Sequence, residues 1–220
     1  MKKCFVLIAI VCAALIAYNR VATKLERGTP AEMEHMALGL ESCSDAVSGC
    51  KREYYIRWKS DINISLINVS SRIRNTAEVN DALNYISNIY RDHAGISVSV
   101  NNENPNAYIY FSDDSLLSRM INGEEAYPGW RFRESYRKFP GGCFGDVGAV
   151  DQEIVSVYIY VPSNVTSDGL ASCLIEELFN ASGLTNDPIG QPSLFASESI
   201  VTIPERFLRY MRVLYGLESW

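Results

Sequence analysis

One stretch decides the fold of this chain: Cys173-Leu-Ile-Glu-Glu-Leu-Phe-Asn-Ala-Ser-Gly-Leu-Thr-Asn-Asp187. Ser167 or Asp168 can cap the start of a helix there, and Gly183 can adopt the left-handed conformation that ends one. Apolar side chains recur on one face at the helical period, namely Leu170, Leu174, Leu178 and Ala181. We therefore predict a helix that buries most of its circumference and leaves one polar arc.

The polar arc of this helix holds the side chains that could do chemistry. Glu176 and Asn180 are four residues apart and share a face, and Cys173 lies on the same arc. Glu177 interrupts the apolar pattern, and positions that break a pattern are where function tends to be found. The solvated side of an ordinary amphipathic helix is the alternative explanation of the same arc.

The stretch resembles the active-site helix of the metzincin zinc proteases. On their pattern, His-Glu-x-x-His-x-x-Gly-x-x-His, Gly183 falls on the glycine and Glu177 on the catalytic glutamate. The metal-ligand positions fall on Glu176, Asn180 and, for the third ligand, Asn186 or Asp187. The resemblance thus predicts a fold and a cleft, with Glu177 as the candidate general base.

Zinc is not expected here through its usual ligands. Proteins bind zinc by neutral imidazole or thiolate, and a carboxylate with amide oxygens makes a much weaker site for it. A hard cation such as Ca²⁺ or Mn²⁺ could still be held through oxygen. The only histidines, His35 and His93, have no ligand partner three or four residues on. His93 can instead favour the C-terminal end of a helix.

The composition indicates one domain and argues against nucleic acid as a partner. The chain has 220 residues, 47% of them apolar, which is enough to bury one ordinary core. Its formal net charge is −6 and its basic residues are scattered. No positive stripe is therefore available to neutralise phosphates.

The N-terminus is typical of an exported protein. Two lysines precede an apolar run from Cys4 to Tyr18, which is shorter than the ~20 residues that span a bilayer comfortably. We predict that residues 1–17 are a signal peptide, or an inner-membrane anchor through residues 4–18 if they are not cleaved. Residues 18–52 read as an irregular linker. The protein is expected in the periplasm or outside the cell.

Four cysteines remain outside the first segment, and they predict two disulfides in an oxidising compartment. Of the three possible pairings, the natural one joins Cys43 to Cys50 and Cys143 to Cys173. Their spacings contain no Cys-x-x-Cys pair, which favours disulfides over a zinc site. A free reactive thiol at Cys173 is a further alternative, although no histidine is evident beside it in the sequence.

The remaining pattern predicts an α+β domain over residues 53–220. Strict alternation of Ile62, Ile64 and Leu66 indicates a half-buried strand. Strands are predicted at 54–67, 96–100, 107–111 and 154–161, and helices at 76–95, 167–183 and from 202 onward. Residues 112–148 read as loop, and Thr202 to Glu205 reads as a capping box that opens the last helix.

Several motifs together resemble an uncharacterised family of exported bacterial proteins, domain of unknown function 2927. They are Ile56-Arg-Trp58, the strand from Asn106 to Phe111, Cys143, the 173–187 stretch, Ser193-Leu-Phe195, and the tail from Val201 to Gly216. The resemblance implies a zincin-like fold, with a small mixed sheet packed on an active-site-type helix and a C-terminal helix. It implies no established activity.

Two functions compete on these residues. The one we favour is a non-catalytic cell-envelope binding protein, whose cleft takes a peptide or envelope protein along its edge strand. The other is a divergent metal-dependent hydrolase or peptidase with Glu177 as general base. The lack of imidazole ligands favours the first. A carbohydrate-stacking face made of Tyr108, Tyr110, Tyr158 and Tyr160 ranks below ordinary cross-strand aromatic pairing.

Overall fold

The computed structural model describes residues 28–38, 54–68, 77–112, 143–162, 165, 167–186 and 202–220. The described elements follow in the order α2 (Pro30–Leu38), β1 (Ile62–Asn68), α3 (Ala77–Ala94), β2 (Val98–Val100), β3 (Ala107–Ser112), β4 (Phe144–Val150), β5 (Glu153–Pro162), α6 (Ser167–Asn180) and α7 (Glu205–Leu214). No helix among these residues is long and apolar enough to cross a membrane. The predicted signal segment lies outside the described residues.

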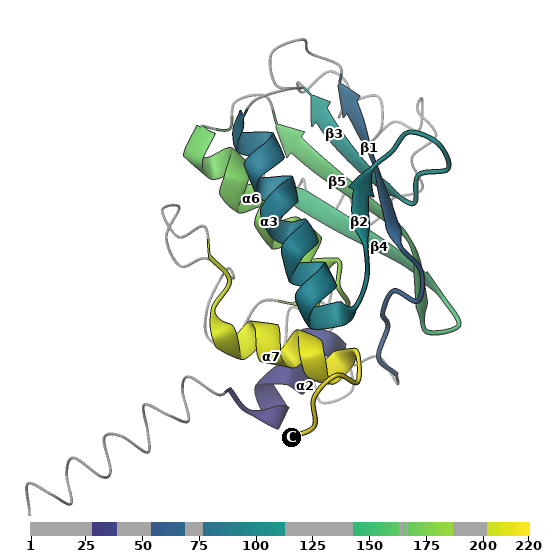
Figure 1. Ribbon diagram of the computed structural model, residues 1–220, viewed down its shortest axis with the longest axis vertical. Coiled ribbons are helices and arrows are strands. Elements are labelled where there is room, and N and C mark those ends of the chain that lie inside the picture. The colour runs from purple at the N-terminus through teal and green to yellow at the C-terminus, as the bar shows by residue number, and fades with distance from the viewer. Residues whose placement is uncertain are drawn as a thin grey trace, which may run out of the picture.

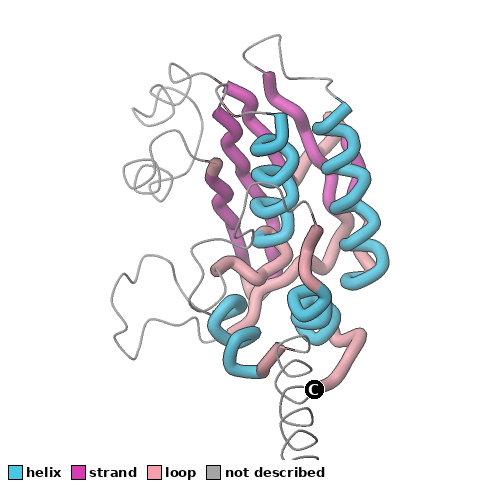
Figure 2. The backbone as a smooth tube through the Cα atoms, turned by 90° about the vertical axis from the view of Figure 1, so that its left-hand side faces the viewer, coloured by secondary structure: helices cyan, strands magenta, loops and turns pink. Residues whose placement is uncertain are grey.

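The strands form one five-stranded sheet in the order β2-β1-β3-β5-β4. β1 is parallel to β2 and β3, and β3 is parallel to β5, whereas β4 is antiparallel to β5. Helices α3 and α6 run side by side along one face of this sheet (Figures 1 and 2). The predicted α+β class, with a small mixed sheet packed on the 167–183 helix, is confirmed, and the predicted C-terminal helix is present and packs against α3.

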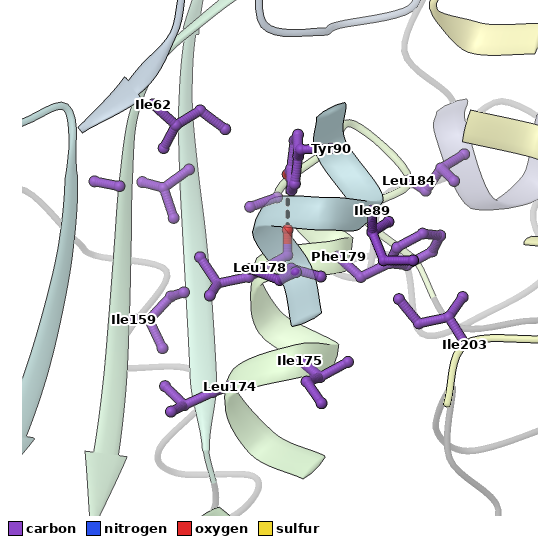
Figure 3. Packing of buried hydrophobic residues seen from close by; sticks show 14 of the residues in the cluster. Ile62, Ile89, Tyr90, Ile159, Leu174, Ile175, Leu178, Phe179, Leu184 and Ile203 are labelled. Atoms are coloured by element: carbon purple, nitrogen blue, oxygen red, sulfur yellow. Dashed lines mark hydrogen bonds between the residues drawn. The ribbon is translucent and has the colours of Figure 1, made fainter. Parts of the chain in front are cut away.

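The core lies between the sheet and this helix pair. In Figure 3, Leu174 and Leu178 of α6 point toward Ile159 of β5, while Phe179 lies on the side of Ile203. The predicted apolar face of α6 is confirmed by the burial of Leu170, Leu174, Leu178 and Ala181. Burial of this kind contributes about 25 cal/mol per Å² of apolar surface. It therefore fixes which side of α6 faces the strands.

Aromatic side chains pair across the outer face of the sheet. Tyr108 and Tyr158 are register partners on β3 and β5, and their rings stack 5.1 Å apart at an interplanar angle of 9°. Each ring therefore has one of its two flat faces turned to the other ring. The pair supports cross-strand packing as the cause of the tyrosine alternation.

The loop predicted at 112–148 is wrong at its end, because β4 occupies Phe144–Val150. Gly145 and Gly148 lower the strand propensity of this segment, which hides it from a sequence reading. The turn into β5 is formed by Asp151 and Gln152, both at positive φ (48° and 68°). That turn type is normally marked by Asn-Gly or Asp-Gly, so the hairpin signal is also absent.

The prediction of an irregular linker over 18–52 is wrong for Pro30–Leu38, which form α2. This helix buries Met33, Met36 and Ala37 in the common core. Thr29 caps this helix through its hydroxyl, which accepts from the Glu32 backbone N–H at 3.1 Å. The Thr29 backbone N–H donates to the Tyr210 hydroxyl of α7 at 2.9 Å, and that hydroxyl also contacts the Glu32 carboxylate. α2 is therefore part of the folded domain.

The last helix begins later than predicted and without the predicted cap. α7 starts at Glu205, Pro204 is its N-cap residue, and no side chain caps it. The Pro204 carbonyl accepts from the backbone N–H groups of Phe207 and Leu208 instead. The predicted apolar face is confirmed by the burial of Phe207, Leu208, Met211 and Leu214.

Candidate functional site

Of the polar side chains singled out on α6, Glu177 is the one whose carboxylate reaches the edge strand β4. Glu177 Oε2 lies 2.6 Å from the position that a Cβ on Gly145 would occupy. Any side chain at residue 145 would therefore meet the Glu177 carboxylate. The glycine thus lets a half-buried carboxylate lie directly against the backbone of an edge strand.

A disulfide fixes this contact. Cys143, just before β4, is bonded to the buried Cys173 of α6, with their Cα atoms 5.9 Å apart. The predicted pairing is thereby confirmed, and Cys173 is neither a free thiol nor a metal thiolate. The predicted Cys43–Cys50 disulfide lies outside the described residues. The cross-link holds the start of β4 and the first half of α6 together.

Two further residues of the polar arc are half-buried, Glu176 and Asn180. Asn180 Oδ1 is fully buried and has no hydrogen-bond partner. A buried acceptor without a donor costs about 1–3 kcal/mol, so such an atom calls for an explanation. It is a place where a bound donor or cation would be favourable.

The third predicted ligand position is used differently. Asn186 is buried, and its side-chain amide donates to the carbonyls of His35 and Met36 in α2, at 3.3 Å each. Its backbone N–H also donates to the Met36 carbonyl at 3.1 Å. Asn186 therefore anchors α2. Asp187 lies outside the described residues.

The described side chains of this region do not fit a zinc ion. They supply no imidazole or thiolate, since His35 is exposed and Cys173 is oxidised. Among the described ranges, no group of three His, Cys, Asp or Glu residues is arranged to hold a metal. Glu176 and Asn180 remain as oxygen donors only, which suit a hard cation better than zinc.

The C-terminal end of α6 is closed by aromatic donors. The last carbonyls of a helix have no partners within it. Here the Leu178 carbonyl accepts from the Tyr90 hydroxyl at 2.7 Å, drawn dashed in Figure 3. The Ala181 carbonyl accepts from Trp58 Nε1 at 2.9 Å, and the Ser182 carbonyl accepts from the Tyr215 hydroxyl at 3.0 Å. Burial raises the pKa of both tyrosines, which keeps them neutral donors.

Gly183 has the positive φ expected of it (+108°), in the turn that follows the end of α6 at Asn180. A Cβ at this residue would lie 2.1 Å from the Ile56 carbonyl oxygen, which is a backbone atom and cannot swing away. Glycine is thus required for two reasons: the positive φ disfavours other residues, and no space is left for a Cβ atom. The same turn carries Ser182, whose buried hydroxyl oxygen has no hydrogen-bond partner.

The sequence suggested that His93 acts as a cation at the C-terminal end of a helix, and the structure shows a different role. Its Nδ1 lies 2.9 Å from Nη1 of Arg212, a group that can only donate, so Nδ1 accepts and the ring is neutral. The pKa of His93 lies below its ordinary value because of burial and the Arg212 charge. Arg212 also binds Glu205 and Glu218, both at 2.8 Å. This network joins α7 to the end of α3.

Gly145 is the site residue that the sequence reading missed. Its role depends on a contact with Glu177, thirty-two positions away, that only the packing of β4 against α6 creates. The one available signal was Cys143, because its predicted link to Cys173 already placed residue 145 near α6. A strand assignment at 144–150 would have completed that inference.

The fold and the site define an α+β domain in which a carboxylate on a buried helix lies under the edge of a mixed sheet. Residues 31–215 match the family described as a protein of unknown function, domain of unknown function 2927. Because this match covers most of the chain, the chain belongs to that family. The comparison with curated proteins gave no match, and neither did the comparison with solved structures.

Proposed function

We propose that this chain is an exported, non-catalytic binding protein that takes an extended peptide segment along the edge of β4. The observation that carries the proposal is the Glu177 carboxylate lying against Gly145 of that edge strand. A peptide added to the edge would gain main-chain hydrogen bonds from β4 and a charged contact from α6. The predicted export signal puts such binding in the periplasm or at the cell envelope.

The two edges of the sheet support the choice of β4. β2 has only three residues, and short edge strands are a common way to discourage further pairing. β4 has seven residues, and no described strand pairs with its outer side. Gly145, Ala149 and Val150 of β4 are exposed. A long, accessible edge beside a carboxylate favours recognition of another chain.

The non-catalytic character is proposed on the chemistry of the ligands. A zincin-like scaffold, in which a helix of this type packs on a mixed sheet, is consistent with the fold. Of the two residues expected to complete a metal site, Asn186 or Asp187, Asn186 uses its amide to hold α2. The scaffold would then retain a peptide-binding edge while lacking the zinc that activates water in such enzymes.

Binding by strand addition is tested with backbone-modified peptides. A library of capped peptides long enough to cover β4 is screened against the full-length chain by fluorescence anisotropy. The best binder is then remade with N-methyl groups on its odd or on its even amides. Strand addition predicts that one of these two series loses binding, because only alternate amides of the peptide face β4. Equal binding by both N-methyl series would contradict it, and so would a library without binders.

A metal-dependent hydrolase with Glu177 as general base is the second candidate. The unpartnered Asn180 Oδ1 favours it, because a hard cation held there with Glu176 would satisfy that oxygen. Elemental analysis of protein purified without chelator decides, with a Glu176→Ala/Asn180→Ala variant alongside. Near-stoichiometric metal that the variant loses would support the hydrolase hypothesis. A turnover activity that Glu177→Gln abolishes would establish it. Absence of metal in both proteins would dismiss it.

A further inference from the structure

The edge of β4 carries one carboxylate on each face of the sheet. Gly145 pairs with Ile159, which is fully buried in the core, so residue 145 faces the helix layer where Glu177 lies. Asp146 is next along the strand and pairs with Tyr158, so it faces the opposite side. Both carboxylates are half-buried and flank the same short piece of edge.

A strand added to this edge would bring its side chains within reach of both carboxylates. Directly opposed Cβ atoms of neighbouring strands are about 4.5–5.5 Å apart. Because Glu177 Oε2 lies 2.6 Å from the Cβ position of Gly145, the opposing peptide Cβ would lie within about 8 Å of that oxygen. An extended lysine or arginine side chain covers such a span, and residue 145 itself places no side chain in the way.

We propose that β4 selects extended peptides with two consecutive basic residues, one paired with Glu177 and the next with Asp146. This inference rests on the proposed peptide-binding function and names its ligand class. Successive residues of a strand point to opposite faces, so contacts on both faces need adjacent basic residues. The net charge of −6 also favours the approach of a cationic peptide.

The pairing does not require either carboxylate to be without contacts inside the chain. An ionised carboxylate offers about four lone-pair sites, so it can accept from a peptide cation in addition to its own neighbours. A single divalent ion fits the same place poorly, because Glu177 and Asp146 are on opposite faces of the strand and cannot share it. Two separate monovalent side chains match this arrangement.

The test compares capped host peptides that differ only at their centre. Lys-Lys, norleucine-norleucine and Lys-norleucine-Lys centres are titrated against the full-length chain by fluorescence anisotropy. We expect the Lys-Lys peptide to bind about tenfold or more tightly than the norleucine pair, because hydrogen bonds between charged groups are stronger than neutral ones. The peptide with alternate lysines should be intermediate, since it can reach only one face. The preference should shrink as salt screens the charges.

Two variants locate the preference on the strand. Glu177→Gln removes the charge, and Gly145→Ala displaces the carboxylate because the new Cβ would meet it. Each should lower the preference for the Lys-Lys centre to about that of a peptide that reaches only one face, because the Asp146 contact remains. Gly148→Ala is the matched control on the same strand, since its Cβ would meet Ser156 Oγ instead. Glu78→Gln, on the exposed start of α3, controls for the lost charge.

The outcomes separate this inference from the function on which it rests. Equal affinity for the lysine and norleucine peptides would overturn the basic selectivity while leaving peptide binding in place. A preference for the Lys-Lys centre that is undiminished in both Glu177→Gln and Gly145→Ala would overturn the assigned position. If none of the peptides binds, the proposed function fails together with its ligand class.

Discussion

The two parts of helix α6 are treated very differently by the rest of the molecule. At the C-terminal end, the carbonyls of Leu178, Ala181 and Ser182 all accept from buried or half-buried aromatic donors. On the polar arc, Asn180 Oδ1 is buried without a donor, and Glu177 lies against an edge strand. In the first part, backbone carbonyls are satisfied by donors from other elements, whereas the second part departs from the rules of a stable core. Such departures are expected at functional sites.

The largest effect is predicted at the C-terminal end, for Gly183→Ala. The change places a side chain at φ +108° and 2.1 Å from the Ile56 carbonyl oxygen. We expect a loss of about 3 kcal/mol or more in the free energy of unfolding, measured by urea denaturation. Gly95→Ala is the matched control, because it has φ +70° and nothing within 4 Å of the added Cβ. It should cost only about 1 kcal/mol. Similar losses for the two variants would contradict the claim that a clash with the Ile56 carbonyl oxygen destabilises Gly183→Ala.

The next effect is predicted for Tyr90→Phe, which removes the donor to the Leu178 carbonyl and leaves that oxygen buried. The expected loss is about 1–3 kcal/mol in the free energy of unfolding. Tyr108→Phe is a suitable comparison, because its hydroxyl donates to the half-buried Pro105 carbonyl in a turn. That change should cost less than about 1 kcal/mol. If Tyr90→Phe proves as mild, the C-terminal end of α6 is not held by its aromatic donors.

Asn186→Ala should destabilise α2 locally more than it destabilises the rest of the domain. The variant loses the side-chain hydrogen bonds to the His35 and Met36 carbonyls, with an expected global loss of about 1 kcal/mol. Amide hydrogen exchange should quicken over Pro30–Leu38 and stay unchanged in β3 and β5. Asn102→Ala, at an exposed turn, should leave α2 protected. Unchanged exchange in α2 would show that Asn186 does not anchor this helix, and would favour the metal-ligand role that the sequence suggested.

A smaller effect concerns pH and the His93–Arg212 contact. The pKa of His93 is lowered in the folded state by burial and by Arg212, so the unfolded chain binds the proton more readily. Stability is therefore complete above the ordinary histidine pKa of about 6.5 and falls as the pH drops below it. The pKa of Glu218 is also lowered, by hydrogen bonds from Arg212 and Arg209, which adds a second loss below about 4.5. Urea midpoints between pH 7.5 and 5.5 should fall in the wild type and stay flatter in His93→Gln.

The smallest change in stability is expected for Glu177→Gln. Because this side chain is half-buried at the edge of the sheet, the free energy of unfolding should change by less than about 0.5 kcal/mol. Urea denaturation beside Tyr90→Phe measures this directly. A loss as large as that of Tyr90→Phe would make Glu177 part of the scaffold, and the contrast between the two parts of α6 would disappear.

The sequence predicted best what depends on periodicity and on local chemistry. The apolar face of α6, the positive φ of Gly183 just after it and the Cys143–Cys173 pair all follow from residues close in the chain or from cysteine pairing. β4 and α2 were missed because their signals are weak. The first contains two glycines, and the second is a short helix whose burial depends on contacts with α7.

The candidate site was only partly predictable for the same physical reason. The pattern singled out Glu177, but its contact with Gly145 is determined by tertiary packing. Asn186 shows the opposite case. Its place in a ligand pattern was read from spacing, whereas its side chain is used to hold a helix more than a hundred residues earlier in the chain.

The most direct test of the central claim is amide hydrogen exchange of the full-length chain, with and without the best-binding peptide. The two edge strands serve as each other's reference within one experiment. Strand addition predicts slowed exchange over Phe144–Val150 of β4 and no change over Val98–Val100 of β2. Protection of β2, or of neither edge while the peptide is bound, would contradict the assignment of β4 as the binding edge.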